Sequence, residues 1–271
     1  MDLAERYGPT ALIAGASDGL GAEFARQLAG VGIDLVLVAR RRDRLEDLAA
    51  GLRADHGVDV RVVALDLAAP GAEVELFAAT DGIEVGLVVY NAGADSVNDR
   101  FLAAPAEAWQ QMVRRNCGVP LAACHHYGAA MTARGRGGVL LVTSGAAWAG
   151  GARLATYGAT KAFDLLLAEG LWAEWRPLGV DVLALVVGAT DTPSLRTSLE
   201  RHGVTVEALA ATVALADPAD VVREGLEQLG DGPTWQVGVP DGAGPSLLGA
   251  LPRRQAVELM TAGNDALFGP A

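Results

Sequence analysis

The chain has 271 residues, of which 51% are apolar, and it carries a formal net charge of −12. This length and composition can supply a sizeable core, while the acidic balance argues against general binding of nucleic acid or of an anionic membrane surface. No run of about 18 apolar residues is present, so we expect no membrane span. The acidic start lacks the basic and apolar pattern of a signal peptide, which favours a cytoplasmic location.

Apolar runs recur along the chain, and segments with helical periodicity follow them. The apolar runs predict strands at residues 10–14, 33–40, 58–67, 84–93, 137–145, 180–190 and 233–239. The periodic segments predict helices at residues 19–32, 42–57, 71–80, 105–134, 155–175, 191–214, 218–232 and in part of 245–269. Pro120 predicts a kink in the fourth of these helices.

Continuously apolar strands that alternate with helices indicate parallel pairing with both faces of the sheet covered. Neither a linker-like composition nor a repeat divides the chain. We therefore predict an α/β fold: a doubly wound, Rossmann-type, mostly parallel seven-stranded sheet with helices on both faces. The prediction places residues 1–271 in one dinucleotide-binding catalytic domain.

A glycine-rich turn, "AGASDGLG", follows the first predicted strand and opens the first predicted helix. A pyrophosphate can approach a backbone that carries no side chains, and the helix N-terminus offers free N–H groups and a positive dipole end. The strand before the glycines and the helix after them favour this reading over a tight turn without a ligand. The turn predicts a cofactor contact for Gly15, Ser17, Asp18, Gly19, Leu20 and Gly21.

The second and third predicted strands end beside the expected adenosine of the cofactor. An acidic residue at the end of the second strand suits NAD, whereas arginine suits a 2′-phosphate. Arg40 and Arg41 stand there, so the sequence favours NADP(H) over NAD(H), although Asp18 adds negative charge near the phosphates. The alternative is a solvated helical turn whose arginines pair with nearby carboxylates. Asp66, with Leu67 after it, predicts either an adenine contact or a turn cap.

Tyr157 and Lys161 lie four residues apart near the start of a long apolar helix, in "YGATK". A free tyrosine has a pKa of about 10, and a positive charge one helical turn away favours the phenolate. Ser144 ends the fifth predicted strand, at the sheet edge where sites collect in this architecture. Taken alone, the tyrosine and the lysine could also share the helix by accident, because both are amphipathic.

In this order, "GASDGLG" at 15–21, "NAG" at 91–93, Asn116, Ser144, Tyr157 and Lys161 resemble the short-chain dehydrogenase/reductase family over roughly residues 8–192. The resemblance implies that Tyr157 donates or accepts the proton, Lys161 activates it, Ser144 orients the substrate and Asn116 joins a proton relay. It also implies cofactor contacts from Tyr157 and Lys161 and from Asn91, Ala92, Gly93, Gly188, Thr190 and Thr192. The chain departs from the family pattern at Ala14, Tyr90 and Val187.

The resemblance implies an NADP(H)-dependent oxidoreductase that transfers a hydride between the nicotinamide and a ketone or secondary alcohol. We expect residues 189–215 to cover the substrate, and their apolar composition favours a hydrophobic substrate. Trp148 and Leu154 fall on the loop that should flank the pocket, where Trp148 is either a wall or surface packing. Two rival hypotheses are a non-catalytic NADP(H) sensor or scaffold on the same fold and a sugar-nucleotide epimerase.

Other residues with metal or redox chemistry are better explained by packing. Cys117 and Cys124 lie on one face of a helix and are expected to be small core residues rather than a disulfide or a metal pair. His125 and His126 are adjacent, so one is expected to pack and the other to face solvent, and no metal site is predicted. The helices 105–134 and 155–176 form subunit interfaces in members of the family, which implies a homodimer or homotetramer.

Overall fold

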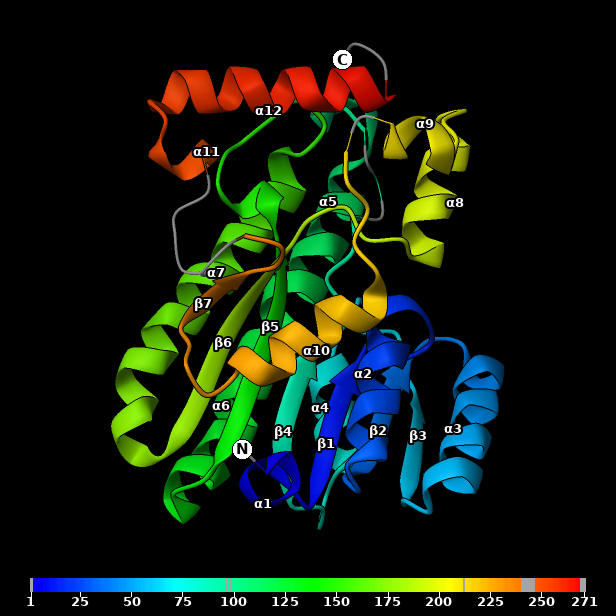
Figure 1. Ribbon diagram of the computed structural model, residues 1–271, viewed down its shortest axis with the longest axis vertical. Coiled ribbons are helices and arrows are strands. Elements are labelled where there is room, and N and C mark those ends of the chain that lie inside the picture. Colours follow the sequence, from blue (N-terminus) through cyan, green and yellow to red (C-terminus); the bar gives the residue numbers. More distant parts are fainter. Residues whose placement is uncertain (1, 96, 98, 212, 240–246, 269–271) are drawn as a thin grey trace.

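A computed structural model describes residues 2–95, 97, 99–211, 213–239 and 247–268, so residues 212, 245, 246 and 269 of the predicted helices lie outside the described part. Seven parallel strands form one sheet in the order β3-β2-β1-β4-β5-β6-β7 (Figure 1). The strands are β1 Thr10–Ala14, β2 Asp34–Ala39, β3 Val60–Ala64, β4 Val85–Tyr90, β5 Gly137–Ser144, β6 Val180–Val187 and β7 Thr234–Gln236. The predicted fold class is confirmed.

Helices cover both faces of this sheet (Figure 1). One face is packed by α1 Leu3–Tyr7, α2 Gly19–Gly30, α3 Arg42–His56 and α10 Pro218–Gln228. The other face is packed by α4 Ala72–Ala79, α6 Val119–Arg134 and α7 Ala155–Trp175. The remaining helices are α5 Ala106–Val113, α8 Pro193–Arg201, α9 Val206–Ala210, α11 Leu247–Ala250 and α12 Arg253–Phe268.

The first strand shows how the sequence builds two cores at once. Side chains alternate between the faces of a strand, so Ala11 and Ile13 of β1 join the core under α2 and α10, while Leu12 and Ala14 join the core under α6 and α7. Because both faces are covered, all five residues of the strand are buried. This explains why the strands are continuously apolar rather than alternating.

The strand order reverses between β1 and β4, which are neighbours in the sheet although β2 and β3 separate them in sequence. A doubly wound sheet leaves a crevice for ligands at such a point, outside the carboxyl ends of the strands. That edge faces the upper part of the molecule in Figure 1, where α8, α9 and α12 lie.

The long predicted helix at 105–134 is interrupted just before Pro120. The chain forms α5, then a π-helical turn over Arg114–Gly118, then α6. Pro120 has no N–H, and the ring of a proline inside a helix crowds the carbonyl four residues earlier, which here is that of Asn116. The predicted disturbance therefore takes the form of a π turn centred on Asn116.

Two other differences concern the ends of the chain. The sequence analysis did not predict α1, whose first turn is capped by the Asp2 carboxylate accepting from the amides of Ala4 and Glu5. It predicted only a partly helical tail, whereas α12 spans Arg253–Phe268 and crosses the top of the molecule (Figure 1). Among the described residues, no helix combines the length and apolarity needed to cross a bilayer.

Candidate active site

The glycine turn lies at the carboxyl end of β1 and contacts the loop after β4. Gly15 has a φ of 83°, and a Cβ there would lie 3.0 Å from Cα of Ala92. A Cβ on Gly21 would overlap the carbonyl oxygen of Gly15, and the Asn91 amide donates to that same oxygen at 3.2 Å. The spacing of these glycines is thus required by close backbone packing at the point where the strand order reverses.

The N-terminus of α2 is left open by its own capping residue. Asp18 occupies the N-cap position, yet its side chain accepts no hydrogen bond from the helix. Its carboxylate instead pairs with Arg41 at 2.5 Å and Arg44 at 3.6 Å. Arg41 also donates to Ser17 Oγ at 3.0 Å. The negative charge that the sequence analysis counted against a phosphate is therefore matched by two guanidinium groups.

The ends of β2 and β3 carry the residues predicted for the adenosine. Arg40 and Arg41 follow β2 and are exposed. Asp66 is exposed, and its Oδ1 accepts a hydrogen bond from the Ala68 amide at 3.0 Å. Of the two roles predicted for Asp66, this contact is that of a turn cap. Leu67 beside it is buried.

The loop after β4 brings the lysine of α7 to this edge of the sheet. Asn91, Ala92 and Gly93 follow Tyr90, the last residue of β4. A Cβ on Gly93 would overlap Nζ of Lys161. The ammonium group therefore lies directly against the backbone of this loop, and only glycine allows that approach.

The turn that follows Ser144 packs against the start of α7, where Tyr157 lies. Ser144 ends β5, and its Oγ accepts from the Ala146 amide at 3.2 Å. A Cβ on Gly158, the neighbour of Tyr157, would lie 3.0 Å from the carbonyl oxygen of Ala146. Tyr157 is half-buried, and its phenol forms no hydrogen bond within the described residues.

Asn116 lies at the centre of the π turn and is fully buried. Its Nδ2 donates to Thr160 Oγ1 at 3.0 Å, and Thr160 Oγ1 donates to the carbonyl oxygen of Tyr157 at 2.8 Å. Its Oδ1 accepts from Nε of Arg115. Single π turns inside α-helices occur frequently at functional sites. Here the turn connects the asparagine to the segment that carries the tyrosine.

The segment after β6 passes beside the glycine turn. Thr190 Oγ1 donates to the carbonyl of Gly188 at 3.3 Å, and Thr192 caps α8 by accepting from the Leu195 amide. A Cβ on Gly19 would lie 3.2 Å from Cβ and Cγ2 of Thr192. The predicted contacts after β1 and after β6 are thus adjacent in space.

One charged group at this site was missed by the sequence analysis. Asp164 of α7 is buried, and its Oδ2 lies 3.2 Å from Nζ of Lys161. Burial raises the pKa of this carboxyl to about 6, while the neighbouring ammonium acts in the opposite direction. The available signal was a lone carboxylate three residues after the lysine, within the apolar run "AFDLLLA".

The loop between Ser144 and Tyr157 is covered by α12, a contact that the sequence analysis also missed. Asn264 of this helix donates to the carbonyl of Ala152 at 3.1 Å, and Thr261 Oγ1 accepts from the Ala152 amide. Arg253 donates to the carbonyl of Trp148 at 2.8 Å. Trp148 is partly buried against the core of the α6 and α7 face, and Leu154 directly precedes α7. The loop is therefore fixed from both sides.

The structure gives the surroundings of Cys117, Cys124, His125 and His126. Cys117 is half-buried, Cys124 is buried, and both are free thiols whose pKa is raised by burial. Both His125 and His126 are exposed, so the expectation that one is packed was wrong, although His126 stacks on Phe77 at 4.0 Å. Among the described residues, no group of three potential ligands could hold a metal ion.

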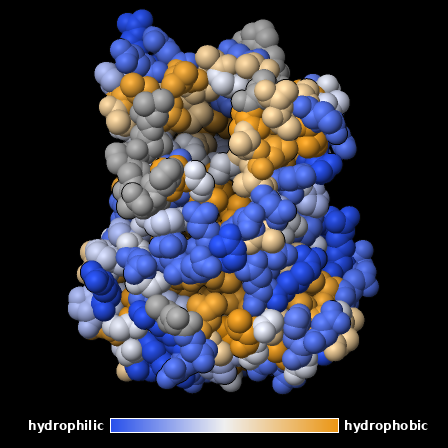
Figure 2. Space-filling view, in the orientation of Figure 1, coloured by the Kyte–Doolittle hydropathy of each residue, from blue (hydrophilic) through white to orange (hydrophobic). Residues whose placement is uncertain are grey.

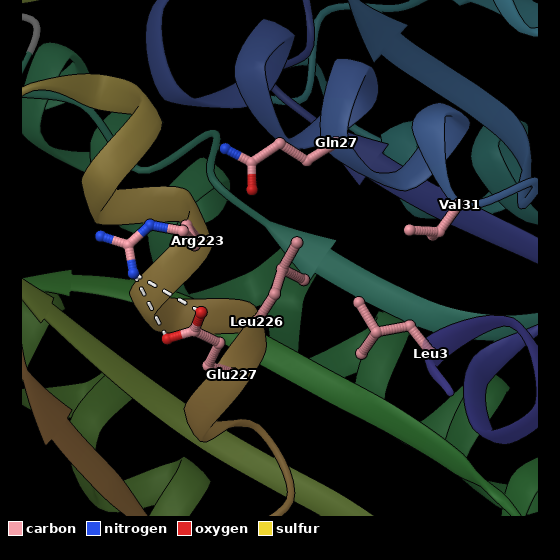
Figure 3. A pocket seen from close by; sticks show the side chains of 6 residues that line it. All are labelled: Leu3, Gln27, Val31, Arg223, Leu226 and Glu227. Carbon is pink, nitrogen blue, oxygen red and sulfur yellow. Dashed lines mark hydrogen bonds and ion pairs between the residues drawn. The ribbon is translucent and has the colours of Figure 1, made fainter. Parts of the chain in front are cut away.

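A separate pocket lies at the opposite end of α2 from the glycine turn (Figure 3). It is lined by Leu3, Gln27, Val31, Arg223, Leu226 and Glu227. The side chains of Arg223 and Glu227 form an ion pair at 3.4 Å. None of the residues predicted for catalysis or cofactor binding contributes to it. The candidate site is therefore the carboxyl edge of the sheet.

Comparison with known proteins agrees with this geometry. A family profile described as short chain dehydrogenase matches residues 9–215. The 7beta-hydroxysteroid dehydrogenase of Collinsella aerofaciens is 36% identical over 232 residues, covering 85% of this chain and 86% of that protein. The enzyme of the same name from Clostridium sardiniense is 32% identical, covering 88% of each.

Solved structures lead to the same family. A 7beta-hydroxysteroid dehydrogenase superposes with a TM-score of 0.87 and 32% identity, covering 96% of this chain and 99% of that one. A short-chain dehydrogenase from Sphingobium yanoikuyae in complex with NADPH superposes with a TM-score of 0.74 and 30% identity, covering 86% and 89%. The profile match and the relatives along most of its length show that the chain belongs to the short-chain dehydrogenase family and is an oxidoreductase acting on CH–OH groups.

Proposed function

We propose that the protein is an NADP(H)-dependent dehydrogenase that interconverts a secondary alcohol and a ketone on a bulky, apolar substrate of the hydroxysteroid type. The proposal is supported by three observations: Ser144 ends β5, Tyr157 and Lys161 lie near the start of α7, and Nζ of Lys161 lies against Gly93 in the loop after β4. A sensor or scaffold on this fold would bind the dinucleotide without needing a proton donor.

In ketone reduction, the half-buried phenol of Tyr157 gives its proton to the substrate oxygen as negative charge develops there. Ser144, at the end of β5, donates a hydrogen bond to the same oxygen and orients it. The Lys161 ammonium, one helical turn from the tyrosine, stabilises the phenolate that remains. The nicotinamide, when bound, supplies or accepts the hydride.

The residues at the sheet edge fit a dinucleotide. The open N-terminus of α2 offers backbone N–H groups and a positive dipole end to the pyrophosphate, because Asp18 does not cap it. Arg40 and Arg41 suit a 2′-phosphate, and no carboxylate stands at the end of β2 to favour a free ribose hydroxyl. A relative 30% identical to this chain has been solved with NADPH, which supports the same preference.

Two features support an apolar substrate. The predicted cover contains α8 and α9, and apolar side chains gather in the upper part of the molecule, where these helices and α12 lie (Figure 2). The similar proteins from Collinsella aerofaciens and Clostridium sardiniense act on a 7β-hydroxysteroid. Hydride transfer at a ring hydroxyl or ketone of a steroid nucleus fits both features.

NADPH consumption against a panel of ketones, with a 7-ketosteroid beside short aliphatic ketones and ketoses, tests this function. We expect turnover of the 7-ketosteroid and little or none of the sugars. Tight NADPH binding without turnover of any ketone would instead favour the sensor hypothesis.

We expect the double variant Arg40→Ala with Arg41→Ala to raise KM for NADPH about tenfold or more, because a charge-assisted contact to phosphate contributes about 1.5–3 kcal/mol. The lost pairing of Arg41 with Asp18 should affect NADPH and NADH alike, so the ratio of the two cofactors' kcat/KM is the measurement. Arg42→Ala is the matched control, since Arg42 pairs with Glu46 at 3.6 Å. An unchanged ratio in the double variant would contradict the assignment of these arginines.

We also propose a homodimer through the face formed by α5, α6 and α7. Val113, Leu121 and Leu166 are large apolar side chains of these helices that are 45–66% exposed. Leu166→Glu should shift the protein toward the monomer in sedimentation velocity, since it places a charge in an apolar interface. Val74→Glu, at a residue of α4 that is 65% exposed, is the control and should leave the molar mass unchanged.

A further inference from the structure

The carboxylate of Asp164 is a buried acidic group beside the residues proposed for catalysis. Its Oδ2 lies 3.2 Å from Nζ of Lys161, and the two side chains are 2% and 3% exposed. Both residues belong to α7 and are three positions apart, so the helix fixes their relative placement. At this depth each ionised group stabilises the other, and the ammonium has a second acceptor in the carbonyl of Val142.

The other contacts of this ion pair hold the ammonium in one place. Nζ of Lys161 also donates to the carbonyl of Val142 at 2.8 Å, and the backbone carbonyl of Lys161 accepts from Thr143 Oγ1 at 2.8 Å. Asp164 Oδ1 has no hydrogen-bond partner among the described residues. Among the described residues, the Asp164 carboxylate therefore accepts a hydrogen bond from the Lys161 ammonium alone.

Other titratable groups face this pair from the elements packed against it. They are Tyr90 of β4, Cys117 of the π turn and Cys124 of α6. Burial raises the pKa of Tyr90, raises that of Cys117 to about 11 and raises that of Cys124 to about 12, so these three groups are neutral near pH 7. The Arg115 guanidinium is directed to Asn116 Oδ1 and the carbonyl of Ala94.

We infer that Asp164 is a positioning residue: its carboxylate offsets part of the positive charge that the Lys161 ammonium presents to Tyr157, while the carbonyl of Val142 keeps the ammonium in place. The inference rests on the proposed roles of Tyr157 and Lys161. The charge of Asp164 then influences the direction of the reaction. The ionised carboxylate favours the protonated phenol of Tyr157, which donates a proton in ketone reduction, over the phenolate, which accepts a proton in alcohol oxidation. Protonation of Asp164 in acid would remove this bias.

Ultraviolet difference titration of the phenol tests the inference without any substrate. The chain has four tyrosines, and burial raises the pKa of Tyr7, Tyr90 and Tyr127. Asp164 also raises the pKa of Tyr90, so the spectrum of Tyr157→Phe made in the same Asp164 background is subtracted at each pH, which isolates the phenol of Tyr157. Seven residues of helix separate Asp164 from Tyr157 by about 10 Å. At that distance, with an effective dielectric of about 20, Asp164→Asn should move the titration of Tyr157 about one pH unit lower.

Two further variants make the result specific. Glu174→Gln removes the same charge from an exposed position of α7 and should leave the titration of Tyr157 where it is in the wild type. Asp164→Ser removes the buried charge with a smaller side chain, so the result does not depend on how asparagine packs. A shift in both Asp164 variants and none in Glu174→Gln supports the inference.

Titration of Tyr157 at an unchanged or higher pH in the Asp164 variants would overturn the inference. The pH profile of kcat/KM for oxidation of a 7β-hydroxysteroid by NADP+ should move in the same direction as the titration. Failure of the proposed function is recognised separately, because Tyr157→Phe would then turn over the steroid as well as the wild type does.

Discussion

Tyr157→Phe is expected to lower kcat/KM for ketone reduction by about 10²–10⁴-fold, the usual contribution of a positioned general acid. The substitution removes one hydroxyl and keeps the ring, so the packing of α7 against β5 should persist. The cofactor contacts proposed for the glycine turn and the arginines are untouched, so the Kd of NADPH should change far less than kcat/KM, by no more than the loss of the one contact expected from the Tyr157 hydroxyl. Steady-state kinetics and a fluorescence titration of NADPH measure the two quantities.

Tyr127→Phe is a matched control because it removes the same atom elsewhere. The Tyr127 hydroxyl bonds to Thr80 Oγ1 at 2.7 Å, on the α4 and α6 side of the sheet. This variant should lose about 1 kcal/mol of stability through the broken buried hydrogen bond and keep its activity. Activity that survives Tyr157→Phe would discard the proposed proton donor, whatever the control shows.

The sequence predicted those parts of the protein that depend on local pattern. Continuous apolar runs, each followed by a segment with helical periodicity, were sufficient to locate all seven strands. Both faces of these strands are buried, so apolar residues are not interrupted by alternating polar ones. The glycines at 15 and 21 were recognisable since a backbone contact that excludes Cβ leaves glycine as the suitable residue. Parallel pairing then brings the carboxyl ends of the strands to one edge, where the predicted site residues lie.

Features that depend on contacts between distant segments could not be predicted in this way. The ion pair of Lys161 with Asp164 is local in sequence, but its meaning depends on burial by β4, β5 and α6. The π turn at Asn116 is stabilised by a side-chain bond to Thr160 of α7, 44 positions away. The docking of α12 on Ala152 joins residues more than 100 positions apart. Pro120 was a local signal of the helix interruption, although it did not predict that the interruption is a π turn.

Gly21→Ala is expected to weaken NADPH binding about 100-fold or more. Gly21 lies in the first turn of α2, and the new Cβ would overlap the carbonyl oxygen of Gly15 and lie 2.9 Å from Nδ2 of Asn91. Backbone cannot move aside as the end of a flexible side chain can, so the helix start and the turn must separate. The amides proposed to bind pyrophosphate would then lose their common orientation. Forced overpacking of this kind also costs about 1–3 kcal/mol of stability.

Gly51→Ala separates this effect from the general consequence of adding a methyl group to a helix. Gly51 lies within α3, is exposed, and a Cβ there would meet nothing within 4 Å. Because alanine is the better helix former, this variant should gain up to about 1 kcal/mol and bind NADPH as the wild type does. Isothermal titration with NADPH and thermal unfolding measure both quantities. If Gly21→Ala bound NADPH with unchanged affinity, the glycine turn would not be the pyrophosphate site, and the cofactor assignments built on it would have to be abandoned.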